Sequence, residues 1–222
     1  MAIADPNRYL APLVEVLRTP WPQNRTVNIV CHGHSVPAGY FATPVVRTFD
    51  AYPHLLHVGL KDRFPLAVIN VIVTAIGGES SESGARRFDA EVLTHRPDVL
   101  TLDYGLNDRG IGTARAEAAW RAMIEKALTA GVRVILLTPT PDITVRSGAP
   151  ESESRPLLEQ ADQIRRLADV YGLGLVDSLA LFLRVWDAAS WSDDLSWSNH
   201  PNRRGHERVA RALLRWFPPA TW

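Results

Sequence analysis

The feature that most constrains the fold of this chain is a regular alternation of short apolar runs with amphipathic segments. Residues 66–73 form the longest apolar run, which is typical of a strand buried on both faces of a parallel sheet. Similar runs predict further strands at 26–31, 97–103, 132–138 and 173–176. The chain therefore offers about five strands, each separated from the next by a longer segment.

The segments between these runs have the apolar periodicity of helices, with apolar residues three and four positions apart. The predicted helices cover residues 6–18, most of 44–64, the segment after Ser80, 114–130, 157–171, 179–186 and 204–217. This alternation predicts an α/β fold, a doubly wound domain whose parallel sheet of about five strands is covered by helices on both faces. We expect one domain over residues 1–222, with residues 1–22 as an N-terminal helical extension.

Composition and charge narrow the class of protein. The 222 residues include 24 Lys and Arg against 24 Asp and Glu, so the chain lacks the positive excess of nucleic-acid-binding proteins. Its one cysteine excludes an internal disulfide framework and a cysteine-based zinc site. The N-terminus shows no signal peptide, and no run reaches the roughly 18 apolar residues that cross a bilayer. We expect a cytoplasmic protein without nucleic-acid or membrane partners; the sequence does not indicate an oligomeric state.

Four loops place polar residues where a doubly wound sheet binds its ligands, outside the carboxyl ends of its strands. Ser35 lies in a small-residue turn after the first strand, where a serine can act as a nucleophile or can simply cap the next helix. His200, followed by the stiff Pro201, would be the base that removes the serine proton. Gly78 and Asn107 follow the second and third strands, and N–H groups there would stabilise an oxyanion together with that of Ser35.

These residues, in this order, resemble the SGNH (GDSL-like) hydrolase family. That family has Gly-Asp-Ser after the first strand, a glycine after the second, Gly-x-Asn-Asp after the third, and Asp-x-x-His-Pro near the C-terminus. The corresponding segments here are 33–35, 76–81, 105–108 and 200–202. The resemblance covers about residues 26–217. It implies a flavodoxin-like three-layer α/β/α sandwich and hydrolysis of carboxylic esters without a metal or other cofactor.

The resemblance also implies a role for each matching residue. Ser35 would be the nucleophile and His200 the base, and the oxyanion hole would consist of Ser35, Gly78 and Asn107. Substrates of many relatives are esters of short acyl groups, so a small-molecule ester such as an acetylated sugar is the expected partner. A thioester or lipid acyl group is an alternative within the same family.

The chain departs from the family pattern at two positions. His34 stands where the family has the aspartate of Gly-Asp-Ser. Trp197 stands where the family has the acid that orients the histidine and stabilises its cation. Asp193 or Asp194 would supply that acid if the loop folded back. A backbone carbonyl or a serine could instead hold the imidazole, leaving a Ser–His dyad, which is the arrangement we favour.

Other polar residues allow weaker predictions. His34, Asp142 and Trp197 are expected to contribute to substrate binding. Asp108 and Arg109 are expected to pair with each other and to brace the loop around them. His32, His34, Asp103 and His200 could in principle bind a metal, but we expect no metal site.

Two other functional classes can be weighed against the esterase. A catalytically silent ligand-binding protein on the same fold would explain the loss of the acid at Trp197, although retention of the serine, glycine, asparagine and histidine favours an enzyme. A nucleotide-binding flavodoxin-like protein is not supported, because the sequence has neither a Gly-x-Gly-x-x-Gly motif nor a Walker loop.

Overall fold

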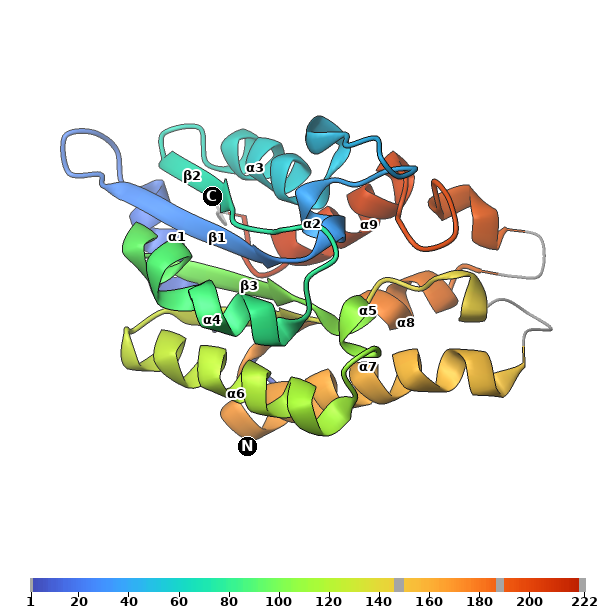
Figure 1. Ribbon diagram of the computed structural model, residues 1–222. Helices are drawn as coiled ribbons and strands as arrows, with labels where there is room; N and C mark the ends of the chain where they lie inside the picture. Colours follow the sequence, from blue (N-terminus) through green and yellow to red (C-terminus); the bar gives the residue numbers. More distant parts are fainter. Residues whose placement is uncertain (1, 146–149, 187–189, 220–222) are drawn as a thin grey trace.

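One parallel sheet occupies the centre of the computed structural model, which describes residues 2–145, 150–186 and 190–219 (Figure 1). The strands are β1 (Thr26–Gly33), β2 (Val68–Val73), β3 (Val99–Asp103), β4 (Arg133–Leu137) and β5 (Gly174–Val176). They lie in the order β2-β1-β3-β4-β5, and every neighbouring pair is parallel. This is a flavodoxin-like strand order, so the predicted fold class is confirmed.

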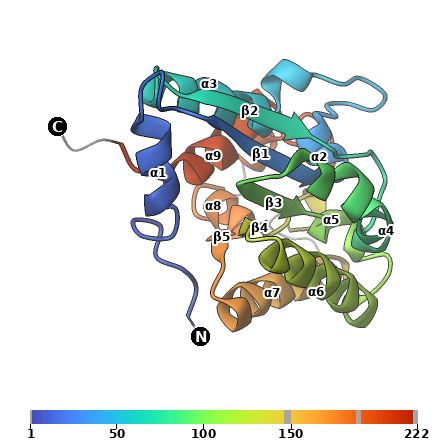
Figure 2. The ribbon, with the colours of Figure 1, turned by 90° about the vertical axis from the view of Figure 1, so that its left-hand side faces the viewer.

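Helices cover both faces of the sheet, as the side view in Figure 2 shows. One layer contains α1 (Ala11–Arg18), α3 (Tyr52–Arg63), α8 (Ser178–Leu183) and α9 (Arg203–Leu214), and the other contains α4 (Ser81–Glu91) and α6 (Thr113–Thr129). The long α7 (Glu151–Tyr171) packs into both apolar clusters. The short helices are α2 (Ser35–Ala38) and α5 (Gly105–Asp108), with 3-10 turns η1 (Thr48–Asp50), η2 (Leu93–His95), η3 (Ile143–Val145) and η4 (Trp191–Asp194).

The apolar periodicity of the sequence explains how α6 packs. Trp120, Met123, Ile124 and Ala127 are fully buried on one face of the helix and belong to the cluster that covers β3 and β4. Burial of each large side chain of this kind contributes about 1.5–3 kcal/mol. Gly131 follows the helix with φ +76°, a conformation that ends helices and favours glycine.

Strand β2 departs from the sequence prediction. It lies at the edge of the sheet, with β1 as its only neighbouring strand. Of its side chains only Ile69 is buried, and Val68 and Val73 are 48% and 41% exposed. The prediction of two buried faces was wrong because a continuous apolar run does not distinguish a central strand from an edge strand.

Several helix boundaries also differ from the predictions. The first α-helix begins at Ala11 instead of residue 6, α7 begins at Glu151 instead of residue 157, and α8 and α9 each end three residues early. In the 44–64 segment only η1 and α3 are helical, because residues 39–47 form a hairpin with an antiparallel bridge between Tyr40 and Val46. That hairpin lies beside the loop that carries Ser35 and, as shown below, contributes to the site. No helix in the described ranges is long and apolar enough to span a membrane.

Candidate active site

The loops that leave β1, β2 and β3 meet at the carboxyl edge of the sheet, on the right-hand side of Figure 1. The end of β1 approaches β3 closely because Gly33 has no side chain: a Cβ there would clash with the Asp103 carbonyl oxygen. The Ser35 backbone then enters the short helix α2. The loop before α9 brings His200 to the same edge.

Ser35 and His200 are in direct contact, although 165 positions separate them in the sequence. The Ser35 Oγ lies 2.9 Å from the His200 Nε2. Both residues are only 6% exposed. A hydroxyl at hydrogen-bond distance from an imidazole nitrogen is the geometry in which a histidine can remove a serine proton.

A backbone carbonyl determines the proton position on this imidazole. The His200 Nδ1 lies 2.9 Å from the Phe41 carbonyl oxygen. A carbonyl can only accept a hydrogen bond, so Nδ1 carries the proton and donates. Nε2 of the neutral ring is then free to accept the hydroxyl proton of Ser35.

The hairpin at 39–47 fixes that carbonyl. The Phe41 N–H donates to the Val45 carbonyl at 2.8 Å, and the Arg47 N–H donates to the Gly39 carbonyl at 2.7 Å. The Arg47 guanidinium lies 3.9 Å from the centroid of the Phe41 ring. These contacts hold the acceptor in the position that a carboxylate would occupy in a Ser–His–Asp triad.

The surroundings of His200 favour its neutral form. Burial lowers the pKa of His200 below its usual value, and a positive charge on His34 would lower it further. The hydrogen bond to the Phe41 carbonyl opposes these effects without reversing them. A neutral imidazole at neutral pH is the form that a general base requires.

Gly78 and Asn107 lie on loops that are joined to each other and to the end of β1. The Asn107 amide donates to the residue after Gly78, and the Ile76 N–H donates to the Gly33 carbonyl at 3.1 Å. Gly78 has φ +81°, which favours glycine, although a Cβ would find open space there. One N–H of the Asn107 amide donates to the Glu79 carbonyl at 2.9 Å, so the second N–H is the one available to a ligand. In the described part of the chain, the backbone N–H groups of Ser35 and Gly78 donate no hydrogen bond.

The neighbouring Gly77 has a packing role. A Cβ at this position would lie 2.7 Å from the Tyr40 ring. The Tyr40 ring in turn lies 6.0 Å from the His200 ring, measured between centroids. Gly77 therefore lets the loop approach Tyr40, whereas Gly78 presents a free N–H.

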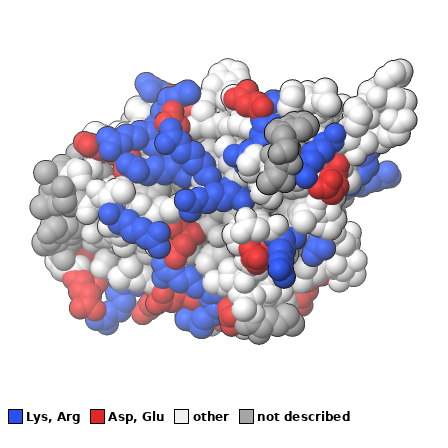
Figure 3. Space-filling view, turned by 180° about the vertical axis from the view of Figure 1, so that it is seen from behind, with Lys and Arg blue, Asp and Glu red and all other residues white. Residues whose placement is uncertain are grey.

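The two acidic candidates for a third member do not contact His200. The Asp194 carboxylate is 1% exposed and binds the Nε atoms of Arg208 at 3.0 Å and Arg204 at 3.2 Å, and the Trp186 indole N–H at 2.9 Å. Asp193 is partly exposed and pairs with Arg204 at 3.3 Å. Figure 3 shows acidic side chains among the basic ones on the rear face of the molecule. Both aspartates thus attach the 190–200 loop to α9.

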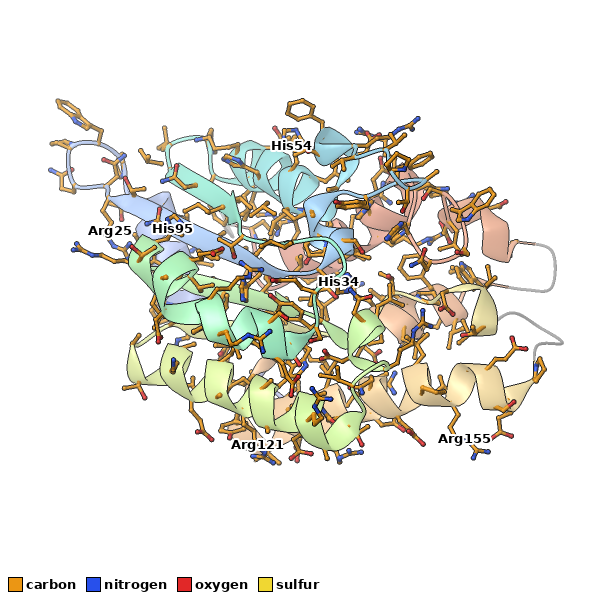
Figure 4. The ribbon with its side chains drawn as sticks, in the orientation of Figure 1. Arg25, His34, His54, His95, Arg121 and Arg155 are labelled. Atoms are coloured by element: carbon orange, nitrogen blue, oxygen red, sulfur yellow. The ribbon has the colours of Figure 1, made fainter. Side chains whose placement is uncertain are left out.

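The residues expected to contribute to substrate binding have different surroundings. His34 is fully buried, and Figure 4 shows it in the interior at the carboxyl end of β1. Asp142 is 2% exposed and pairs with Arg109, and it also accepts a hydrogen bond from the Thr144 N–H at 2.9 Å. Trp197 is 71% exposed and is the one of the three that a ligand can reach without rearrangement.

The predicted ion pair between Asp108 and Arg109 was wrong. Asp108 is fully buried and accepts hydrogen bonds from the Ser81 N–H and the Trp120 indole N–H, each at 2.7 Å. Neutral donors therefore satisfy its carboxylate, while Arg109 turns to Asp142. Adjacent residues in a helical turn do not face each other, which explains the error.

The four residues considered as metal ligands do not converge on one point. Only His34 and Asp103 face each other, whereas His32 and His200 contact other groups. The His32 ring contacts the Thr74 hydroxyl at 2.8 Å and the Tyr104 hydroxyl at 3.0 Å. Burial lowers the pKa of His32 to about 4. No group of three or more His, Cys, Asp or Glu in residues 2–145, 150–186 and 190–219 is arranged to hold a metal ion.

The sequence allowed for a backbone carbonyl as the partner of the histidine but did not identify Phe41 as its source. The Phe41 carbonyl contacts His200, and a backbone carbonyl leaves no trace in residue identity. Sequence reasoning named Asp103 only as a possible metal ligand and missed that its carboxylate faces the His34 ring. It also missed Tyr52, whose hydroxyl donates to that carboxylate. An aspartate at the end of a buried strand was a usable signal, since the carboxyl ends of the strands form the site.

Comparison with known proteins places this geometry in a wider context. The chain matches the GDSL-like lipase/acylhydrolase family over residues 31–208. It is 22% identical over 169 residues to an acetylxylan esterase of Geobacillus stearothermophilus, a match that covers 70% of this chain and 75% of that protein.

Solved structures of an acetylxylan esterase from Geobacillus stearothermophilus have the same fold. One superimposes with a TM-score of 0.74 at 20% identity and covers 88% of this chain and 97% of that one. Another, a catalytic mutant with a histidine replaced by alanine, gives 0.75 at 19% identity and covers 92% and 100%. At these identities the structural likeness concerns the fold alone.

Proposed function

The chain belongs to the GDSL-like lipase/acylhydrolase family, and on that basis we propose that it is a serine esterase with a Ser35–His200 dyad. The observation that carries the proposal is the 2.9 Å contact between the Ser35 Oγ and the His200 Nε2, with Nδ1 of the same ring bonded to the Phe41 carbonyl. The resemblance to acetylxylan esterases supports the coarser assignment, hydrolysis of a carboxylic ester.

Acylation would proceed as follows. His200 takes the Ser35 hydroxyl proton at Nε2 while the Oγ attacks the ester carbonyl carbon. The imidazolium that forms keeps its Nδ1–H on the Phe41 carbonyl. His200 then gives the proton to the leaving alcohol, and the carbon–oxygen bond to that alcohol breaks.

Deacylation would use the same groups. Water loses a proton to His200 and attacks the acyl-enzyme, which releases the acid and restores the Ser35 hydroxyl. In both steps the oxyanion would accept hydrogen bonds from the backbone N–H groups of Ser35 and Gly78 and from the free N–H of the Asn107 amide. Removal of one such donor typically costs about 100- to 1000-fold in turnover.

We propose short acyl groups, of the acetyl type, as the substrate class, with Trp197 at the substrate site. The support is the match to an acetylxylan esterase and the 71% exposure of the Trp197 side chain on the loop that carries His200. Hydrolysis of p-nitrophenyl acetate, butyrate and octanoate tests this proposal. Turnover should fall as the acyl chain lengthens; faster hydrolysis of octanoate would favour a lipid acyl hydrolase.

The same assay tests the dyad. We expect Ser35→Ala to reduce turnover to the background rate, and His200→Ala to reduce it by at least about 100-fold. Ser152→Ala, at an exposed position of α7, is a matched control that should keep full activity. Background rates in the wild type and both variants, together with no labelling of Ser35 by a fluorophosphonate, would favour a silent binding protein.

A further inference from the structure

The Ser35 hydroxyl faces a second imidazole, which the mechanism above does not use. The His34 Nδ1 lies 3.3 Å from the Ser35 Oγ, against 2.9 Å for the His200 Nε2. His34 is fully buried at the carboxyl end of β1, whereas His54 and His95 lie at the periphery of the molecule (Figure 4).

The hydrogen bonds of His34 define where its proton lies. The Val36 N–H donates to Nδ1 at 3.2 Å, so Nδ1 is unprotonated and presents a lone pair. The proton of the neutral ring is therefore on Nε2, which faces the Asp103 Oδ1 at 3.4 Å. Within the described chain neither of these two atoms makes a hydrogen bond, so the contact between them is electrostatic.

Asp103 is held in place by contacts with β1, with the residue that follows β1, and with α3. Gly33 and Asp103 are in register between β1 and β3, and the His34 N–H donates to the Asp103 carbonyl at 3.2 Å. The Tyr52 hydroxyl, from α3, donates to the Asp103 Oδ2 at 3.3 Å. Burial and the nearby carboxylate raise the pKa of Tyr52, so its hydroxyl stays a donor. No Lys or Arg of the described residues pairs with this carboxylate.

We propose that His34, held in its Nδ1-acceptor form by Asp103, is a second proton acceptor for the Ser35 hydroxyl, in addition to His200. The pair repeats the logic of a carboxylate that orients an imidazole toward a serine. It occupies the position where the family pattern has an aspartate instead of a histidine. The inference rests on the proposed function and deepens it.

The second acceptor would be weaker than the first. Its distance to the Oγ is longer, and Nδ1 must release the Val36 N–H before it can take a proton. In a protein that lacks His200, the Ser35 O–H bond would break as the Oγ–acyl bond forms, with the proton passing to the His34 Nδ1. The resulting imidazolium would face Asp103, and a p-nitrophenolate group would leave with its electron pair without needing a proton.

Removal of His200 is the background in which this role becomes measurable. We would follow the pre-steady-state release of p-nitrophenolate from p-nitrophenyl acetate at excess enzyme, which reports acylation. We expect His200→Ala to acylate at least about tenfold faster than Ser35→Ala. The double variant His34→Asn/His200→Ala should fall to the Ser35→Ala rate.

Asparagine at position 34 separates the catalytic role from a structural one. Its side-chain oxygen can still cap the Val36 N–H, as asparagine does at many helix N-termini, but it cannot accept a proton from the serine. If His34 only caps α2, the residual rate of His200→Ala will survive the His34→Asn change, and the proposal is wrong. Thermal unfolding of each variant checks that the turn is intact.

Asp103→Asn in the His200→Ala background gives an independent measurement that does not alter His34. It removes the charge that stabilises a His34 imidazolium, so the residual rate should fall by about tenfold. In the His34→Asn/His200→Ala background the same substitution should have no effect. A residual rate in His200→Ala no higher than in Ser35→Ala would overturn the proposal, whereas full wild-type activity of Ser35→Ala would overturn the proposed function itself.

Discussion

Two buried aspartates lie close to the loops that carry the histidines, and their surroundings differ. Asp194, before α9, binds two guanidinium groups and an indole N–H. Asp103, at the end of β3, accepts from the Tyr52 hydroxyl and faces the His34 ring, and no Lys or Arg of the described residues pairs with it. The arginines neutralise the Asp194 carboxylate and tie its loop to α9. The charge of Asp103 is not neutralised in this way, so it can act on the His34 imidazole. The partners of a buried carboxylate therefore say more about its role than its distance along the chain from a histidine.

The largest effect that we expect is on the stability of the Asp194 region. Asp194→Asn removes the buried charge that Arg204 and Arg208 share, and should lower the free energy of unfolding by about 2–3 kcal/mol. The fraction that remains folded should turn over within about threefold of the wild type, because Asp194 does not contact His200. Urea denaturation and p-nitrophenyl acetate hydrolysis measure the two quantities.

Asp193→Asn is the matched control for that change. Its ion pair with Arg204 is half exposed, so stability should change by less than about 1 kcal/mol. A fall of 100-fold or more in the turnover of folded Asp194→Asn would contradict the comparison and restore Asp194 as a third catalytic member.

The contacts around Asp103 include a histidine that titrates, so the stability of this region should depend on pH, unlike that of the arginine-bound Asp194. Tyr52, which donates to Asp103, also donates its backbone N–H to the Nδ1 of His206 at 3.2 Å. Burial lowers the pKa of His206 to about 3, against about 6.5 when unfolded. Because the folded pKa is the lower one, protonation favours unfolding, and stability falls as the pH drops below 6.5 until it reaches the folded value.

His206→Asn should reduce this acid sensitivity. Asparagine can still accept from the Tyr52 N–H but does not titrate, so the loss of stability between pH 6.5 and pH 5 should shrink by about 2 kcal/mol relative to the wild type. Urea denaturation at the two pH values measures the difference. An unchanged loss would mean that His206 is already protonated in the folded protein at pH 5.

Most of the fold could be predicted from the sequence, because apolar periodicity reports directly on burial. The parallel sheet and the helices on both of its faces follow from alternating strands and helices with right-handed connections, whereas the strand order was not predicted. The exposure of β2 and the hairpin at 39–47 could not be predicted, because both depend on which neighbours the sheet provides. A run of valines and isoleucines looks the same at an edge as in the centre.

The site could be predicted only where side chains carry the chemistry. Ser35 and His200 were named from their loops, and the structure brings them together. The Phe41 carbonyl was not named, because any residue can supply a carbonyl and only the hairpin determines which one. Asp103 was considered only as a metal ligand, since the sequence does not show that its neighbour in space is His34.

The fall of kcat/KM at acidic pH gives a further test of the difference between Asp103 and Asp194. Burial lowers the pKa of His200, so kcat/KM should fall only as the pH drops below 6.5, when the base becomes protonated. A positive charge on His34 lowers the pKa of His200, and Asp103 is the carboxylate that favours such a charge. Asp103→Asn should therefore move this acidic limb to higher pH by up to about one unit. Asp194→Asn should leave the limb in place, because arginines already neutralise that carboxylate. A larger shift for Asp194→Asn would reverse the roles that we assign to the two aspartates.

The smallest effect that we expect comes from restoring the family's acid. In Trp197→Asp the new carboxylate would stand on an exposed position of the loop, while the Nδ1 of His200 is already bonded to the Phe41 carbonyl. The new carboxylate cannot bond to the same N–H unless the loop moves. The kcat with p-nitrophenyl acetate should therefore change by less than about threefold. Trp197→Asn separates any loss of the indole from the effect of the charge. A kcat at least tenfold higher in Trp197→Asp, but not in Trp197→Asn, would show that the Phe41 carbonyl supports the histidine less well than a carboxylate does.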